Sequence, residues 1–77
     1  MDDKNYAIRD YSTGALLYSF RHETVECGTS TETRWSDKPP YLKMGASLAL
    51  AIQEEIAQRN PDRQPTIVYT KYIKESN

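Results

Sequence analysis

The sequence predicts an α+β fold: an antiparallel β-hairpin or three-stranded meander, one long helix packed on a face, and a C-terminal strand on a sheet edge. Three observations predict it. Two segments rich in Tyr, Ile, Leu and Val flank a turn near the start, a helical apolar period lies between two proline sites, and a β-branched segment lies near the end. Because 77 residues suffice for one small domain, we assign residues 1–77 to a single domain.

The first hairpin is predicted from residues 4–11 and 15–26, which Ser12, Thr13 and Gly14 separate. Glycine permits the positive φ that tight turns need, so this triplet is a turn signal. With a three-residue loop, Tyr11 would face Ala15. That register places five apolar side chains on one face, which we expect to be the core face: Tyr6, Ile8, Leu16, Tyr18 and Phe20.

Residues 29–35 alternate in a pattern that fits a third strand, with Cys27 and Gly28 as the preceding turn. In this register Trp35 lies opposite Phe20 on the core face, but Glu23 lies opposite Glu32, which is a like-charge pair. The alternative is a polar loop over residues 28–39. The sequence leaves both open.

A helix is expected from Pro40 to Arg59, because proline suits the first turn and the following Asn-Pro pair ends the ladder. At 100° per residue, one apolar face is directed to the sheet and comprises Tyr41, Met44, Gly45, Leu48, Ile52 and Ile56. A second strip lies about 120° away and comprises Leu42, Ala46, Leu50 and Ala57. This strip is either a seam for a partner or a set of good helix formers with one exposed leucine.

The last strand is expected over residues 66–74, where both faces are half apolar. Such a pattern leaves the preferred face open and suits a covered position or a dimer edge. The hexapeptide before it, from Asn60 to Pro65, is a short polar helix-to-strand loop.

Composition argues against several function classes. Ten Lys and Arg against eleven Asp and Glu give a net charge of −1, which supplies no field to attract nucleic acid or an anionic membrane. The single cysteine cannot form an intramolecular disulfide, and no apolar run approaches the roughly 20 residues of a membrane span. The acidic, polar start differs from a secretory signal. We therefore expect a cytoplasmic protein without a membrane partner.

The densest cluster of reactive residue types runs from His22 to Cys27. On a strand, His22 and Glu26 would share a face about 13 Å apart, too far to ligate one metal, and Cys27 would point to the other face. Adjacent Glu54 and Glu55 diverge by about 100° on a helix and make no acid–base pair. We therefore expect no enzyme, metal or cofactor.

Apolar side chains point in more directions than one small core can absorb. This predicts a non-catalytic accessory or regulatory protein that acts by protein–protein interaction, as a homodimer, with another protein or a second copy as partner. The predicted partner-binding residues form two groups, the helix strip and the segment entering the helix: Leu42, Ala46 and Leu50; Arg34, Trp35 and Tyr41. For Trp35 and Tyr41, a place in the core is the competing interpretation.

The alternative function is nucleic-acid binding by the outer face of the sheet. Its residues would be Arg9, Tyr11, Arg21 and Arg34. Glu23 and Glu32 share that face and the pI is about 5.7, whereas binding to duplexes depends largely on neutralising phosphates with basic side chains.

Overall fold

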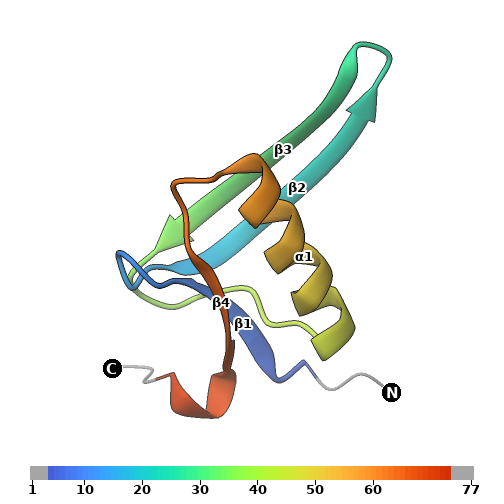
Figure 1. Ribbon diagram of the computed structural model, residues 1–77. Helices are drawn as coiled ribbons and strands as arrows, with labels where there is room; N and C mark the ends of the chain where they lie inside the picture. The colour runs from blue at the N-terminus through green and yellow to red at the C-terminus, as the bar shows by residue number, and fades with distance from the viewer. Residues whose placement is uncertain (1–3, 74–77) are drawn as a thin grey trace.

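A computed structural model describes residues 4–73, and Figure 1 shows one sheet with one helix across a face. The sheet order is β3-β2-β1-β4, and every neighbouring pair is antiparallel. The elements are β1 (Tyr6–Asp10), β2 (Leu16–Val25), β3 (Gly28–Ser36), α1 (Ala46–Arg59), β4 (Pro65–Tyr69) and the 3₁₀ turn η1 (Thr70–Tyr72). The predicted α+β class is confirmed, as is the position of the C-terminal strand at a sheet edge.

The third strand is present, so the alternative of a polar loop over residues 28–39 is wrong. Val25 pairs with Gly28, which makes Glu26 and Cys27 the turn in place of the predicted Cys27 and Gly28. Gly28 has φ 143°, a conformation that favours glycine, directly after the turn. The resulting register removes the like-charge pairs, because Arg21 now lies opposite Glu32.

The first hairpin differs from the prediction by one residue, since Arg9 pairs with Leu16. Its loop is longer than three residues: the Asp10 N–H donates to the Ala15 carbonyl at 2.8 Å, and the Gly14 N–H donates to the Asp10 carbonyl at 2.7 Å. A one-residue shift exchanges the faces of a strand. Leu17, not Leu16 or Tyr18, therefore joins Ile8 in the core beneath the helix.

A bulge in β2 corrects the alternation further along. The pairing with β3 skips Tyr18, which is 39% exposed, between Leu17 and Ser19. Trp35 consequently lies opposite Leu17, and not opposite Phe20 as predicted, while Phe20 still packs against the core. One extra residue thus keeps both Leu17 and Phe20 on the helix side.

The helix begins at Ala46, six residues later than predicted, and ends at Arg59 as predicted. The preceding segment is not helical because its backbone pairs with the sheet. The Leu42 N–H donates to the Leu17 carbonyl at 2.9 Å, and Met44 and Tyr6 exchange two hydrogen bonds of 2.8 and 3.0 Å. Residues 42–44 therefore bridge β1 and β2, whose direct pairing is confined to Arg9 and Leu16.

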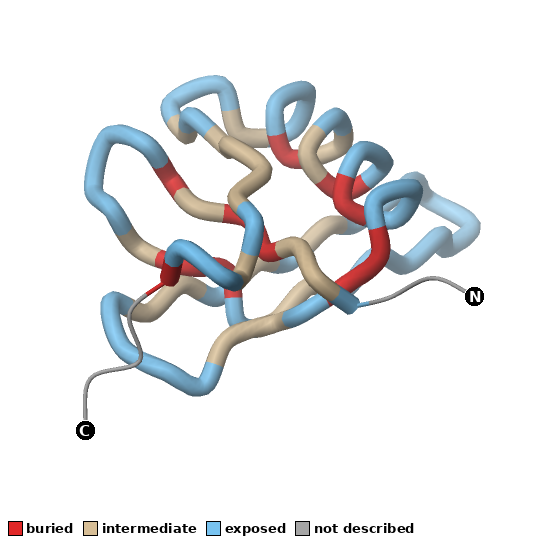
Figure 2. The backbone as a smooth tube through the Cα atoms, turned by 90° about the horizontal axis from the view of Figure 1, so that it is seen from below, coloured by how far each residue is buried: buried red, intermediate tan, exposed pale blue. Residues whose placement is uncertain are grey.

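The core lies between α1 and the sheet, where Figure 2 shows buried residues on both elements. Helix residues Ala49, Ile52 and Ile56 are buried there, whereas Leu48 is 54% exposed, contrary to the predicted sheet-facing set. The helix is rotated so that Ala49 occupies the inner position. The buried members of this main core are Ile8, Leu17, Met44, Ala49, Ile52 and Ile56.

A second, smaller core lies on the opposite face of the sheet, where Ala7, Leu16 and Ile73 are buried. The chain reaches it because β4 ends at Tyr69 and η1 turns back, with the Thr70 N–H donating to the Asn5 carbonyl at 2.8 Å. The strand predicted over residues 66–74 is therefore too long. Its last residue, Lys74, lies outside the described residues.

Candidate functional site

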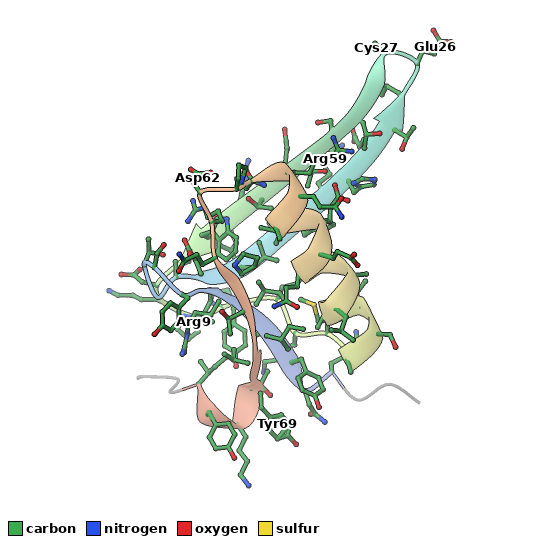
Figure 3. The ribbon with its side chains drawn as sticks, viewed as in Figure 1. Arg9, Glu26, Cys27, Arg59, Asp62 and Tyr69 are labelled. Atoms are coloured by element: carbon green, nitrogen blue, oxygen red, sulfur yellow. The ribbon has the colours of Figure 1, made fainter. Side chains whose placement is uncertain are left out.

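The distal halves of β2 and β3 form an arm, which we define as residues 21–30. Every residue of the arm is exposed. Figures 1 and 3 show it projecting past the end of α1, with Glu26 and Cys27 at its tip. The radius of gyration is 12.6 Å, above the roughly 11.5 Å expected for a compact chain of this length. The arm is thus a strand pair without a core of its own.

An open groove of about 250 Å³ lies where the root of the arm meets α1. Its apolar wall includes the half-buried Phe20 and the exposed Leu48, with His22 and Glu55 contributing polar atoms. Concave apolar surface with few polar groups is typical of binding sites. The lining residues are Phe20, His22, Leu48, Ala51, Ile52 and Glu55.

A polar cluster connects the arm to the helix beside this groove. Glu55 Oε2 accepts hydrogen bonds from Arg59 Nε at 2.9 Å and from Thr31 Oγ1 at 3.1 Å. Thr31 Oγ1 lies 3.1 Å from His22 Nδ1. Since the Thr31 hydroxyl has one proton and donates it to Glu55, His22 Nδ1 must be the donor to Thr31.

The charge of Glu55 is stabilised within this cluster. The hydrogen bond from Arg59 lowers the pKa of Glu55 more than partial desolvation raises it, and Thr31 and the charges of Arg59 and His22 lower it further. His22 Nδ1 lies 3.7 Å from Glu55 Oε2. No local pattern predicts this cluster, because Thr31 and Glu55 lie on different elements 24 positions apart.

A second polar cluster is centred on Asp10, whose side chain is buried. Its carboxylate accepts hydrogen bonds from Arg63 Nη1 at 2.8 Å, Ser12 Oγ at 2.9 Å and the Gln64 N–H at 3.2 Å. Desolvation raises the pKa of Asp10, but these donors, Arg63 foremost, outweigh it and hold that pKa well below its usual range. The cluster ties the first turn to the loop before β4.

Arg63 also stacks on Trp35, with its guanidinium carbon 4.9 Å from the ring centroid. Trp35 Nε1 donates to Thr33 Oγ1 at 2.9 Å. Trp35 is half-buried against the main core and lines a hollow of about 220 Å³ with Tyr18, Ser36 and Pro40. Trp35 is therefore only partly accessible, between Arg63 on one side and the main core.

The predicted group Arg34, Trp35 and Tyr41 does not come together as one surface. Trp35 packs against the main core, Tyr41 packs against the second core on the other face, and Arg34 is exposed opposite Ser19. The core interpretation that competed for Trp35 and Tyr41 describes their packing better.

Leu42, predicted as part of the helix strip, does not lie on the helix. Leu42 precedes the helix and packs against the main core, because its extended segment bonds to β2. Ala46 and Leu50 are exposed on α1, with Leu50 59% accessible. Two successive exposed leucines, Leu48 and Leu50, thus point to different sides of the helix, and Leu48 is the one that lines the groove.

The residues of the nucleic-acid alternative are accompanied by acidic side chains. Arg21 Nε lies 2.7 Å from Glu23 Oε1 and Arg21 faces Glu32 across the strands. Arg9 is half-buried and its Nε is buried without a hydrogen-bond partner, whereas Tyr11 is 75% exposed beside the first turn. Arg34 is exposed. The four residues therefore do not form one uniformly exposed and basic surface.

Over residues 4–73, no three or more His, Cys, Asp or Glu side chains are grouped in a way that could hold a metal ion. In the same part of the chain, no helix has both the length and the apolar character needed to cross a membrane. Comparison with known proteins found no match to a family model, to a curated protein or to a solved structure.

Proposed function

We propose that this chain is a non-catalytic accessory protein that acts by binding protein, and that it works as a homodimer. The observation that carries the proposal is the arm: all of residues 21–30 are exposed on a strand pair that projects from the body. An extended surface of this kind offers backbone and side chains to a partner on both faces and along an edge.

The arm is weakly supported by its own chain. A two-stranded hairpin is marginally stable in water, and ordering its backbone costs about 1–2 kcal/mol per residue. The side-chain contacts between the arm root and the body include the hydrogen bonds joining His22, Thr31 and Glu55. A protein partner would supply the burial that the arm lacks.

The groove places apolar surface beside the arm. Leu48 and Phe20 are partly or largely accessible there, next to a carboxylate whose pKa is lowered. A patch that is apolar in the centre and polar at its rim suits protein contact. Nucleic-acid binding is favoured less, because Glu23 and Glu32 neutralise the outer face around Arg21.

Sedimentation velocity of the wild-type chain tests the proposal. Between about 1 and 100 µM, a range typical of measurable protein self-association, we expect a concentration-dependent shift toward twice the chain mass of 8.9 kDa. A single species of 8.9 kDa across that range would contradict the homodimer.

A further inference from the structure

We infer that two copies pair antiparallel along the free edges of β3, with the two-fold axis at Thr33. The two four-stranded sheets would then join into one continuous sheet with both helices on the same side. This inference rests on the proposed homodimer and assigns its interface.

The two edges of the sheet differ in how they are protected. β4 has five residues, begins at Pro65 and is ended by η1, so it offers a short edge. β3 has nine residues, lacks Pro and Lys, and is regular because the bulge residue Tyr18 belongs to β2. Short length, Pro, Lys and bulges usually protect natural edge strands from pairing with another chain, and β3 has none of these. Within residues 4–73, no strand pairs with the outer side of β3.

The charges of β3 are self-complementary in one register. Glu32 and Arg34 lie on the outer face on either side of Thr33. When Thr33 faces itself across a two-fold axis, Glu32 lies directly opposite Arg34 of the second copy, and the pair occurs twice. Directly opposed residues of opposite charge stabilise antiparallel strands.

Neighbouring registers lack this match. A two-fold axis at Glu32 places two glutamates opposite each other, and an axis at Arg34 places two arginines opposite each other, which is destabilising. An axis at Thr31 places Glu32 opposite Ser30, so Glu32 gains no oppositely charged partner from the second copy. Moving the axis by one residue shifts the pairing by two residues. Odd shifts of the pairing are excluded, because a two-fold axis normal to the sheet keeps paired residues on the same face.

The helix-side face also fits this register. Thr31 would lie opposite Trp35 of the second copy, an aromatic next to a β-branched residue, and Thr33 would meet its own equivalent. Residues 30–36 of each copy would pair. Each arm would extend beyond the paired residues, away from the axis.

Charge reversal tests the register. Arg34→Glu should raise the dimer dissociation constant by about tenfold or more, because each of the two Glu32 side chains then faces a glutamate. The double variant Glu32→Arg with Arg34→Glu recreates both opposite-charge pairs and should return the dissociation constant to within about threefold of wild type. Lys71→Glu, on exposed η1, is the matched control and should leave it unchanged.

A cross-link tests the same register without relying on charge. In a Cys27→Ser background, Thr33→Cys should form an intermolecular disulfide on mild oxidation, since directly opposed Cα atoms lie about 4.5–5.5 Å apart. Thr31→Cys is the control, because its two copies would lie about 13 Å apart along the strands and should not link.

The outcomes separate the two proposals. A wild-type monomer would overturn both. A wild-type dimer that ignores Arg34→Glu, or in which Thr33→Cys links no faster than Thr31→Cys, would overturn the pairing at β3 and leave the homodimer standing. Selective linking through Thr33→Cys together with rescue by the double variant would support the pairing.

Discussion

The base and the tip of β2 belong to one strand but to two environments. At the base, Leu16 and Leu17 are buried on opposite faces, each in a different core; at the tip, residues 21–25 are all exposed. The base is held by packing, whereas the tip is held by its backbone pairing with β3. The body therefore has buried side chains on both faces of the sheet, while the arm has strand pairing without buried side chains.

A substitution in the packed body should have the largest effect and tests its difference from the arm most strongly. Ile56→Ala removes a fully buried side chain from the main core and should lower the free energy of unfolding by about 3 kcal/mol. Val25→Ala in the arm, where the side chain is half exposed, should change it by less than about 0.5 kcal/mol. Urea denaturation of both variants measures the difference. Equal effects would show that the arm is as tightly integrated as the body.

The next largest effect concerns Asp10. Asp10→Asn should lower the free energy of unfolding by about 2 kcal/mol, because a buried acceptor of several hydrogen bonds loses its charge beside Arg63. Thermal unfolding at pH 7 measures it. Ser12→Ala, which removes one donor and keeps the carboxylate, is the milder control.

The same carboxylate sets an acid dependence. Since the folded pKa of Asp10 lies below its ordinary value of 3.8, its stabilisation is present above about pH 5 and is lost as the pH falls through and below that value. Wild type should therefore lose stability more steeply between about pH 5 and 2 than Asp10→Asn. Parallel slopes would contradict the assignment.

The groove allows a comparison at nearly constant exposure. Leu48 and Leu50 are 54% and 59% exposed, but only Leu48 lines the groove. Proteins from the native host that bind the tagged wild-type chain through the groove should be retained by Leu50→Glu and lost with Leu48→Glu, while both variants keep wild-type unfolding midpoints. Loss with both variants, or with neither, would remove the groove from the proposed surface.

The smallest expected effect lies at the joint between arm and helix. Thr31→Val removes the hydroxyl between His22 and Glu55, so amide hydrogen exchange over residues 22–31 should become faster. The denaturation midpoint should stay close to wild type, because the joint is only partly buried and the substitution removes a single hydroxyl. Unchanged exchange would show that strand pairing alone orders the arm root.

The sequence predicted the elements better than their mutual positions. Local signals located the strands, the C-terminal end of the helix, and the burial of Ile8, Ile52 and Ile56. These features depend on periodicity and turn chemistry within a few residues, which a single sequence displays.

The registers and the helix start depended on contacts between distant segments. Asp10 accepts a hydrogen bond from Arg63, 53 positions away, and the bridge formed by residues 42–44 depends on backbone groups of Tyr6 and Leu17. The residues of the groove come from β2 and α1, so only the tertiary fold brings them together. Charge pairing across β3 is an available signal: the predicted register opposes Glu23 to Glu32, which counts in favour of a loop, whereas a turn at Glu26 and Cys27 removes the conflict.

The ion pair between Asp10 and Arg63 also bears on the order in which the chain folds. Because its two halves are 53 positions apart, the hairpin nearest the N-terminus reaches its final geometry only after nearly the whole chain has emerged and closed a long loop. During synthesis, β1 and β2 would remain loosely joined until β4 arrives beside β1. The final geometry of this hairpin therefore includes contacts of high sequence separation, which are the contacts that slow the folding of small domains.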